Sequence, residues 1–317
     1  MLLFLSFSLY GHKKHILVIE SYHADYSWDI SYKRGLEKAI GGEYEIFYFE
    51  MNTKRLAKSE FKKMANLAWK RYKKLKPSLV VLGDDNALKC LGGRFAKTNT
   101  PVVYLGINNN PRAYDMIRHK NITGVLERPL LKRSIIYIKD LIKVKKILIL
   151  FDSGTTSTTF KKGIFKNKNS MFLNGVNIDI KFIDNYNNWK RNIIESKKNG
   201  YDAVIIGLYH TIKDDDNKHI NSEEVLEWTS ENTPLPPFSF WDFSVGKNKT
   251  IGGYVLFGEE QGIVAGKMVL DILSGKSPRT IEPKTAEKGK FLFSKYQLKK
   301  WKIKLTDNIK AKTFYSK

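Results

Sequence analysis

The stretch HILVIESYHADYSW at residues 15–28 decides the class of fold. It opens with His15 to Glu20, a short β-branched apolar run of the kind that forms a buried strand. A dense polar and aromatic turn follows, and a helical pattern then runs from Trp28 to Ile40. Strand, turn and helix in this order form the unit from which parallel sheets covered by helices are built.

The rest of the chain repeats this unit. In the first half we expect strands at 15–20, 44–49, 79–82, 102–105 and 123–125, with helices at 28–40, 59–75 and from Asn86. In the second half we expect helices at 130–141, 156–166, 188–198 and 222–232, with strands at 146–151, 176–182, 203–207 and 238–240. The fold class is therefore α/β, with two doubly wound parallel-sheet lobes, and 317 residues suffice for both.

The composition, with 42% hydrophobic and 27% charged residues, is typical of a chain that buries a core. The unbroken apolar run from Met1 to Tyr10 is shorter than the roughly 20 residues that span a bilayer. We interpret residues 1–13 as a truncated secretory signal segment without its basic leading part, and a frayed apolar N-terminus is the plainer alternative. Cys90, the single cysteine, is expected to be a small buried residue.

The formal net charge is +23, from 55 basic and 32 acidic residues. Lysine pairs such as Lys62-Lys63 and Lys197-Lys198 are spread over most expected helices, without an aromatic-interleaved stripe or a nucleic-acid motif. We therefore expect a solvated lysine-rich surface and no nucleic-acid partner. Weak attraction to an anionic membrane surface stays open.

Ligands of open parallel sheets lie beyond the carboxyl ends of the strands, so the residues just after each strand are candidates for a site. Aromatic faces can stack on a ring or a cation, and one of two carboxylates at a helix start can accept an ammonium. The alternatives are that the aromatic side chains cover the sheet end and that the polar ones cap helices or form turns. The first-half candidates are Ser21, Tyr22, His23, Trp28, Asp84, Asp85, Asn86, Asn108 and Asn109.

The second half offers similar loops. A strand leads through Asp152, Ser153, Thr155 and Thr156 into a helix, whose hydroxyl and N–H groups can hold a carboxylate. Further candidates after two other strands are Tyr209, Trp241 and Asp242, although core packing is the commoner role of a single aromatic side chain.

Motifs for cofactors and catalysis are missing from the sequence. It contains no P-loop, no G-x-G-x-x-G after a strand, no H-E-x-x-H and no G-x-S-x-G. We therefore expect no nucleotide cofactor, no protein-built metal site and no catalytic residues.

Taken together, the loops resemble those of the ABC-transporter substrate-binding proteins called "ABC sub bind", and of related extracellular sensor domains of bacterial histidine kinases. The segments that carry the resemblance are 19–28, 83–87, 106–109, 123–125 and 252–262, within a match of about 14 to 317. It implies a type I periplasmic binding protein with a three-segment hinge near 126–128, 257–258 and 280–283. Lobe I would comprise residues 14–126 and 258–280, and lobe II residues 127–257 and 281–317.

The resemblance also implies a function. It predicts a secreted, periplasmic or extracellular monomer without enzymatic activity, which captures a small polar, amino-acid-like or aromatic ligand between the lobes for the permease of an ABC importer. The alternative is a periplasmic protein that reports its ligand to a membrane histidine kinase or another receptor. Asp84 and Asp85 stand where transporter relatives often carry small or hydroxyl residues, which favours the sensor version at this loop.

Overall fold

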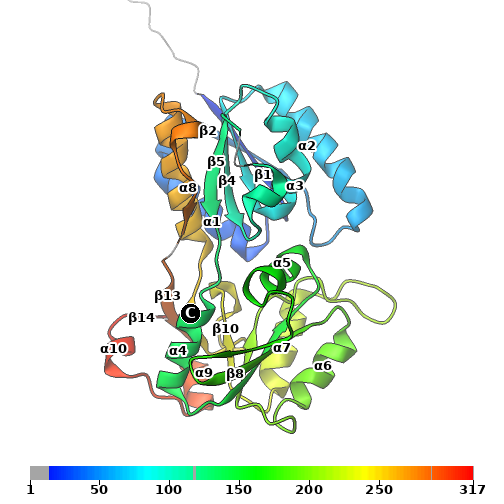
Figure 1. Ribbon diagram of the computed structural model, residues 1–317, viewed down its shortest axis with the longest axis vertical. Coiled ribbons are helices and arrows are strands. Elements are labelled where there is room, and N and C mark those ends of the chain that lie inside the picture. The colour runs from blue at the N-terminus through cyan, green and yellow to red at the C-terminus, as the bar shows by residue number, and fades with distance from the viewer. Residues whose placement is uncertain (1–13, 117–118, 287, 317) are drawn as a thin grey trace, which may run out of the picture.

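The computed structural model describes residues 14–116, 119–286 and 288–316, so the expected signal segment at 1–13 lies outside the described residues. Two sheets, each with helices on both faces, form two lobes stacked along the long axis of the molecule (Figure 1). This is the α/β architecture expected from the sequence. The predicted strands fall within two residues of the observed bounds.

The first lobe contains a six-stranded parallel sheet in the order β12-β5-β4-β3-β1-β2. Its strands are β1 (His15–Glu20), β2 (Glu45–Glu50), β3 (Leu79–Gly83), β4 (Val102–Ile107), β5 (Ile122–Leu126) and β12 (Lys284–Thr285). One face packs on α1 (Ser27–Ile40) and α8 (Gly258–Leu273), and the other on α2 (Phe61–Leu75) and α3 (Asp84–Phe95). Both faces of β1 are buried, which explains its unbroken apolar run.

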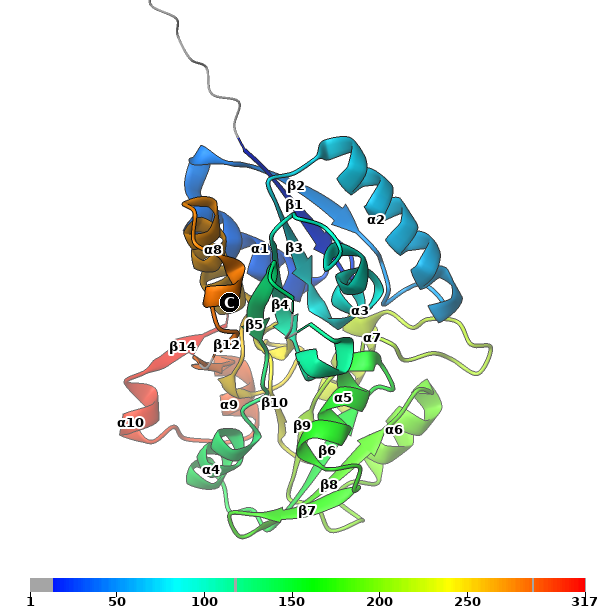
Figure 2. The same ribbon diagram turned by 45° about the horizontal axis from the view of Figure 1, so that its top comes forward.

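Helices α1 and α8 lie side by side although more than 200 positions separate them in the chain (Figure 2). Their approach depends on glycine. A Cβ built on Gly262 of α8 would lie 2.0 Å from the carbonyl oxygen of Tyr32 on α1. Only a residue without a side chain therefore permits this helix spacing.

The second lobe contains a five-stranded sheet in the order β10-β9-β6-β8-β7. Its strands are β6 (Lys146–Phe151), β7 (Ser170–Leu173), β8 (Val176–Phe182), β9 (Ala203–Ile206) and β10 (Pro237–Ser239), and its helices are α4 (Leu131–Leu141), α5 (Thr155–Ile164), α6 (Tyr186–Ile194) and α7 (Ser222–Asn232). Strand β7 was not predicted and runs antiparallel to β8. The turn between them is Asn174-Gly175, both with positive φ, which is a strong hairpin signal.

A third, three-stranded sheet in the order β11-β13-β14 completes the second lobe. Its strands are β11 (Gly252–Val255), β13 (Lys290–Phe293) and β14 (Thr313–Tyr315), with α9 (Lys295–Lys300) and α10 (Asp307–Lys310) between the last two. None of its three strands was predicted from the sequence.

The chain passes between the lobes after β5, before α8 and after β12 (Figure 1). Strand β12 pairs with β5, Lys284 opposite Val125, and Ala286 N donates to the carbonyl oxygen of Leu126. These backbone bonds keep residues 284–286 with the first sheet, whereas the predicted division at 280 assigned them to the second lobe. The third crossing therefore begins later than expected.

Candidate functional site

The space between the lobes contains two cavities lined by residues that follow strands of both sheets. The inner one has a volume of about 10 Å³ and the outer one about 780 Å³. Both are lined by Tyr22 and Lys54 of the first lobe and by Thr156 and Leu208 of the second, so they belong to one cleft. Its place at the carboxyl ends of the strands is the expected one for this architecture.

Aromatic side chains from both lobes close the inner cavity. Tyr26 lies edge-on to Tyr22, with ring centroids 5.2 Å apart, and its ring centroid is 5.8 Å from that of Phe243 in the second lobe. Phe243 in turn stacks on Trp241 at 6.2 Å. The hydroxyl oxygen of Tyr22 lies 3.4 Å from Oγ1 of Thr156, which adds a polar contact between the lobes. These side chains offer several ring faces to a bound group.

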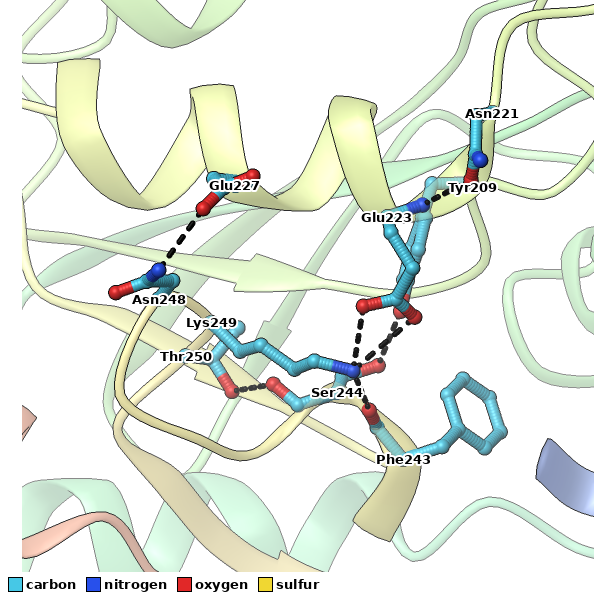
Figure 3. A network of polar contacts seen from close by, with 9 residues as sticks. All are labelled: Tyr209, Asn221, Glu223, Glu227, Phe243, Ser244, Asn248, Lys249 and Thr250. Atoms are coloured by element: carbon cyan, nitrogen blue, oxygen red, sulfur yellow. Dashed lines mark hydrogen bonds and ion pairs between the residues drawn. The ribbon is translucent and has the colours of Figure 1, made fainter.

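A network of polar contacts with α7 and with residues 249–250 holds the loop that carries Phe243 (Figure 3). Lys249 Nζ lies 2.8 Å from a carboxylate oxygen of Glu223 on α7 and donates to the carbonyl oxygen of Phe243. Thr250 donates its hydroxyl hydrogen to the carbonyl oxygen of Ser244 at 2.7 Å. Phe243 is therefore presented to the cleft by a braced loop.

The adjacent carboxylates Asp84 and Asp85 at the start of α3 differ completely in their surroundings. Both oxygens of Asp85 are occupied: Oδ2 accepts from the amide of Asn108, and Oδ1 from the amide of Asn109 and the hydroxyl of Tyr114. Asp84 is also buried, yet its Oδ2 has no hydrogen-bond partner. Asp85 thus holds the loop after β4, while Asp84 faces the inner cavity with an unused acceptor.

Asp84 is an unusual position in two further respects. Its φ of 66° is left-handed, a conformation that is costly for a residue with a side chain. Burial raises the pKa of Asp84 well above its usual range, with added repulsion from nearby carboxylates, Asp29 foremost. A bound cation would reverse this penalty, because it favours the ionised carboxylate.

Lys54, four residues beyond β2, supplies the positive charge of the cleft. Its side chain is half-buried, and Nζ lies 4.3 Å from the ring centroid of Tyr22 and 4.8 Å from that of Tyr26. Burial lowers the pKa of Lys54, and the carboxylates of Asp152 and Asp84 oppose this shift. No ion pair among the described residues includes Lys54. Its ammonium group instead makes cation–π contacts with the two aromatic rings.

Glu127, directly after β5 on the first crossing segment, joins the two lobes. Trp241 Nε1 donates to its Oε1 at 2.7 Å, and Asn108 Nδ2 donates to its Oε2 at 3.0 Å. Burial raises the pKa of Glu127 to about 7, while these two donors act in the opposite direction. The carboxylate therefore connects the first crossing segment by hydrogen bonds to Asn108, which follows β4 of the first lobe, and to Trp241, which follows β10 of the second.

The predicted candidates line the inner cavity, the outer cavity or neither of them. The inner cavity is lined by Tyr22, Trp28, Asp84, Asn108, Thr156 and Trp241. The outer cavity is lined by Asn86, Asp152, Ser153 and Thr155, together with Tyr22 and Thr156. Neither is lined by Ser21, His23, Asp85, Asn109, Tyr209 or Asp242.

Several candidates have structural partners that account for them. Ser21 donates its hydroxyl hydrogen to the carbonyl oxygen of Gly83 and accepts from the amide of Ala87, which joins β1 to α3. Asp152 accepts from the amide of Gly154, the hydroxyl of Ser157 and the amide of Thr211. Tyr209 lies in the core of the second lobe with its hydroxyl near Ser244, and Asp242 pairs with Lys290 at 3.4 Å. His23 Nδ1 lies 2.7 Å from the carboxylate of Asp25.

Five residues that line the inner cavity were not among the predicted candidates: Tyr26, Lys54, Glu127, Leu208 and Phe243. Lys54 follows the second strand, so the strand-end rule would have found it had the loop at 51–55 been considered. Tyr26 lies two positions before the predicted candidate Trp28, and Phe243 directly follows the predicted candidate Asp242.

Among the described residues, no group of three or more His, Cys, Asp or Glu side chains is placed to hold a metal ion. Within the same residues, no helix is both long and apolar enough to cross a bilayer.

Solved structures with similar coordinates define the fold. The ABC domain in complex with L-Trp from Streptococcus pneumonia has a TM-score of 0.69 at 18% identity, over 96% of this chain and 99% of that one. A conserved domain protein from Vibrio cholerae scores 0.69 at 14% identity, over 96% and 100%. A ligand-free, open substrate-binding protein with adhesive properties from Clostridium difficile scores 0.65 at 15%, over 96% and 99%. The fold is that of type I periplasmic binding proteins.

The sequence adds the family. The family model described as "ABC transporter substrate binding protein" matches residues 55–317, which is more than half of the chain. The protein belongs to this family, as its loops predicted, and substrate-binding proteins of the family are extracytoplasmic. A comparison with curated proteins gives no match.

Proposed function

We propose that the protein is a secreted, monomeric substrate-binding protein that captures an amino-acid-like solute between its lobes and presents it to the permease of an ABC importer, without catalysing a reaction. One observation carries the proposal. Asp84 is an acidic and Lys54 a basic side chain, both line the same inner cavity, and no ion pair among the described residues includes either of them. A zwitterionic ligand would satisfy both groups at once.

The surroundings assign a role to each end of such a ligand. Asp84 would accept hydrogen bonds from the ligand ammonium, and Lys54 would pair with its carboxylate. Thr155 and Thr156, at the N-terminus of α5, line the outer cavity together with Lys54 and would add donors for the same carboxylate. The rings of Tyr22, Tyr26, Trp28, Trp241 and Phe243 would receive an aromatic side chain. The bound L-Trp of the similar Streptococcus structure agrees with this assignment.

Entry of a ligand requires movement, because side chains leave only about 10 Å³ in the inner cavity. Separation of the lobes about the three crossing segments would open it, as in hinge closure around a ligand. The similar Clostridium difficile protein is described in an open, ligand-free form, which supports such a motion. The matched family is that of transport proteins, so the sensor alternative is not carried further.

The test is calorimetric titration of the purified protein with L-tryptophan, tryptamine and indole-3-propionate. The first carries both charges, the second lacks the carboxylate and the third lacks the ammonium. We expect L-tryptophan to bind most tightly, because only it satisfies both Asp84 and Lys54.

Asp84→Asn should weaken L-tryptophan binding by about 1.5–3 kcal/mol, the contribution of a hydrogen bond to a charged group. Asp140→Asn on the exposed side of α4 is the matched control, since it removes one carboxylate far from the cleft. Equal affinities for the two variants would exclude Asp84 from the site, and failure of all three ligands to bind would reject an aromatic amino acid as the ligand.

A further inference from the structure

The C-terminal segment 295–316 concentrates positive charge on one part of the second lobe. It contains seven lysines and one acidic residue, Asp307. All seven lysine side chains are exposed. Their density is about one in three, compared with 55 lysines and arginines among 317 residues in the whole chain. The excess charge of the protein is therefore not spread evenly.

Exposed aromatic side chains lie among these lysines. Tyr296 is 51% exposed, Phe314 64% and Tyr315 39%. Nζ of Lys295 on α9 lies 4.8 Å from the ring centroid of Tyr315 on β14, so helix and strand are neighbours. We call residues 295–315 the basic-aromatic surface. Tyr296 and Tyr315 are 19 positions apart, so the sequence shows no local stripe, and the contact of Lys295 with Tyr315 brings their two segments together.

We propose that the basic-aromatic surface docks the protein on bilayers that contain anionic lipid headgroups. Lysine ammonium groups near a membrane are attracted to anionic headgroups, and aromatic side chains are favoured at the boundary between headgroups and acyl chains. Phe314 has no polar atom and is the most exposed of the three aromatics. A bilayer has an apolar region in which Phe314 can be buried. A soluble polyanion would attract the lysines but has no apolar region for Phe314.

The position of the surface permits docking without blocking the cleft. No residue of the segment lines either inter-lobe cavity. In both views α10 and β14 lie on the side of the second lobe away from α6 (Figures 1 and 2). Strand β14 is also the last strand of its sheet in the order β11-β13-β14, so its outer edge has no partner strand within the part of the chain that the structure describes. A docked protein would keep its ligand site accessible beside the membrane.

The test is co-sedimentation of the full chain with vesicles of phosphatidylglycerol mixed with phosphatidylcholine, and with vesicles of phosphatidylcholine alone. The surface variant is Lys295→Gln, Lys299→Gln, Lys304→Gln and Lys312→Gln. The matched control is Lys62→Gln, Lys70→Gln, Lys73→Gln and Lys74→Gln on α2, which removes the same charge from exposed positions of the first lobe. Residues 1–13 are identical in all proteins, and the neutral vesicles measure their contribution.

We expect the surface variant to lose at least about tenfold in partitioning to the anionic vesicles, since each lysine near such a membrane contributes favourably. The control should lose less than about threefold. Its charges lie in the other lobe, so salt screens their attraction to a membrane docked at the basic-aromatic surface. Phe314→Ser should lower the binding that persists in 0.5 M salt by about threefold or more, through lost apolar burial. Equal losses for surface and control variants, no preference for anionic vesicles, or no effect of Phe314→Ser would each overturn the proposal. A thermal melt of each variant checks that it is folded.

Discussion

Replacing Lys54 by methionine should convert the cleft from a site for zwitterions into a site for amines. Methionine keeps the length and flexibility of the side chain and removes only its charge. In the structure the Lys54 ammonium lies over the rings of Tyr22 and Tyr26, at 4.3 and 4.8 Å from their centroids. Its loss therefore removes the proposed partner of a ligand carboxylate and also frees two aromatic faces for another cation.

The size of the effect follows from these two contacts. A hydrogen bond to a charged group contributes about 1.5–3 kcal/mol, so Lys54→Met should weaken L-tryptophan binding by roughly 10- to 150-fold. Tryptamine lacks the carboxylate and loses nothing. It should bind at least as tightly as before, because an ammonium over a ring gains about 0.5–2 kcal/mol and no longer competes with Lys54.

The assay is calorimetric titration of both ligands into wild type, Lys54→Met and Lys58→Met. Lys58 lines the outer cavity and is exposed, so its replacement removes the same charge near the mouth of the cleft. The informative quantity is the ratio of the two ligand affinities, which a general loss of stability leaves unchanged. If Lys54→Met weakens both ligands by the same factor, Lys54 does not recognise the carboxylate, and its role is structural.

Two predictions concern stability. Burial raises the pKa of Glu127 to about 7 from 4.5, so the folded state keeps a proton that the unfolded state releases, and stability falls by up to about 3 kcal/mol as pH rises from 4.5 to 7. Urea unfolding at pH 5 and pH 8 should show that Glu127→Gln removes part of this slope; an unchanged slope contradicts the assignment. Gly262→Ala should cost about 1–3 kcal/mol, because its methyl group meets the carbonyl of Tyr32, whereas Gly93→Ala on α3 has open space around it and should stabilise slightly. Equal melting temperatures for the two alanine variants would show that α1 and α8 can separate freely.

The sequence was sufficient to predict most of the two large sheets, because strands buried on both faces leave unbroken apolar runs such as His15–Glu20. It did not predict the three-stranded sheet. Strand β11 begins with Gly252 and Gly253, which lack side chains and have positive φ, and it pairs with a segment almost 40 positions later. Neither apolar periodicity nor a local turn signals such a pairing.

The sequence predicted where the candidate site lies, but not which role each of its residues has. Asp84 and Asp85 are neighbours in the same loop, and only the fold shows that one is occupied by Asn108, Asn109 and Tyr114 while the other is unused. Tyr209 illustrates the opposite error. It follows a strand as a site residue would, yet it packs into the core of the second lobe, which is the common fate of a large ring.

The pairing of α1 with α8 also affects folding during synthesis on the ribosome, because the first lobe cannot finish folding until α8 has been made. The apolar side chains that β1 turns toward α1, Ile16 and Val18 among them, share a core with Val269 of α8. Synthesis reaches α8 only after nearly the entire second lobe, so the lobe that begins first is finished late. The nascent chain therefore carries an unfinished apolar face through most of its synthesis, and the protein must be kept from aggregating during that interval.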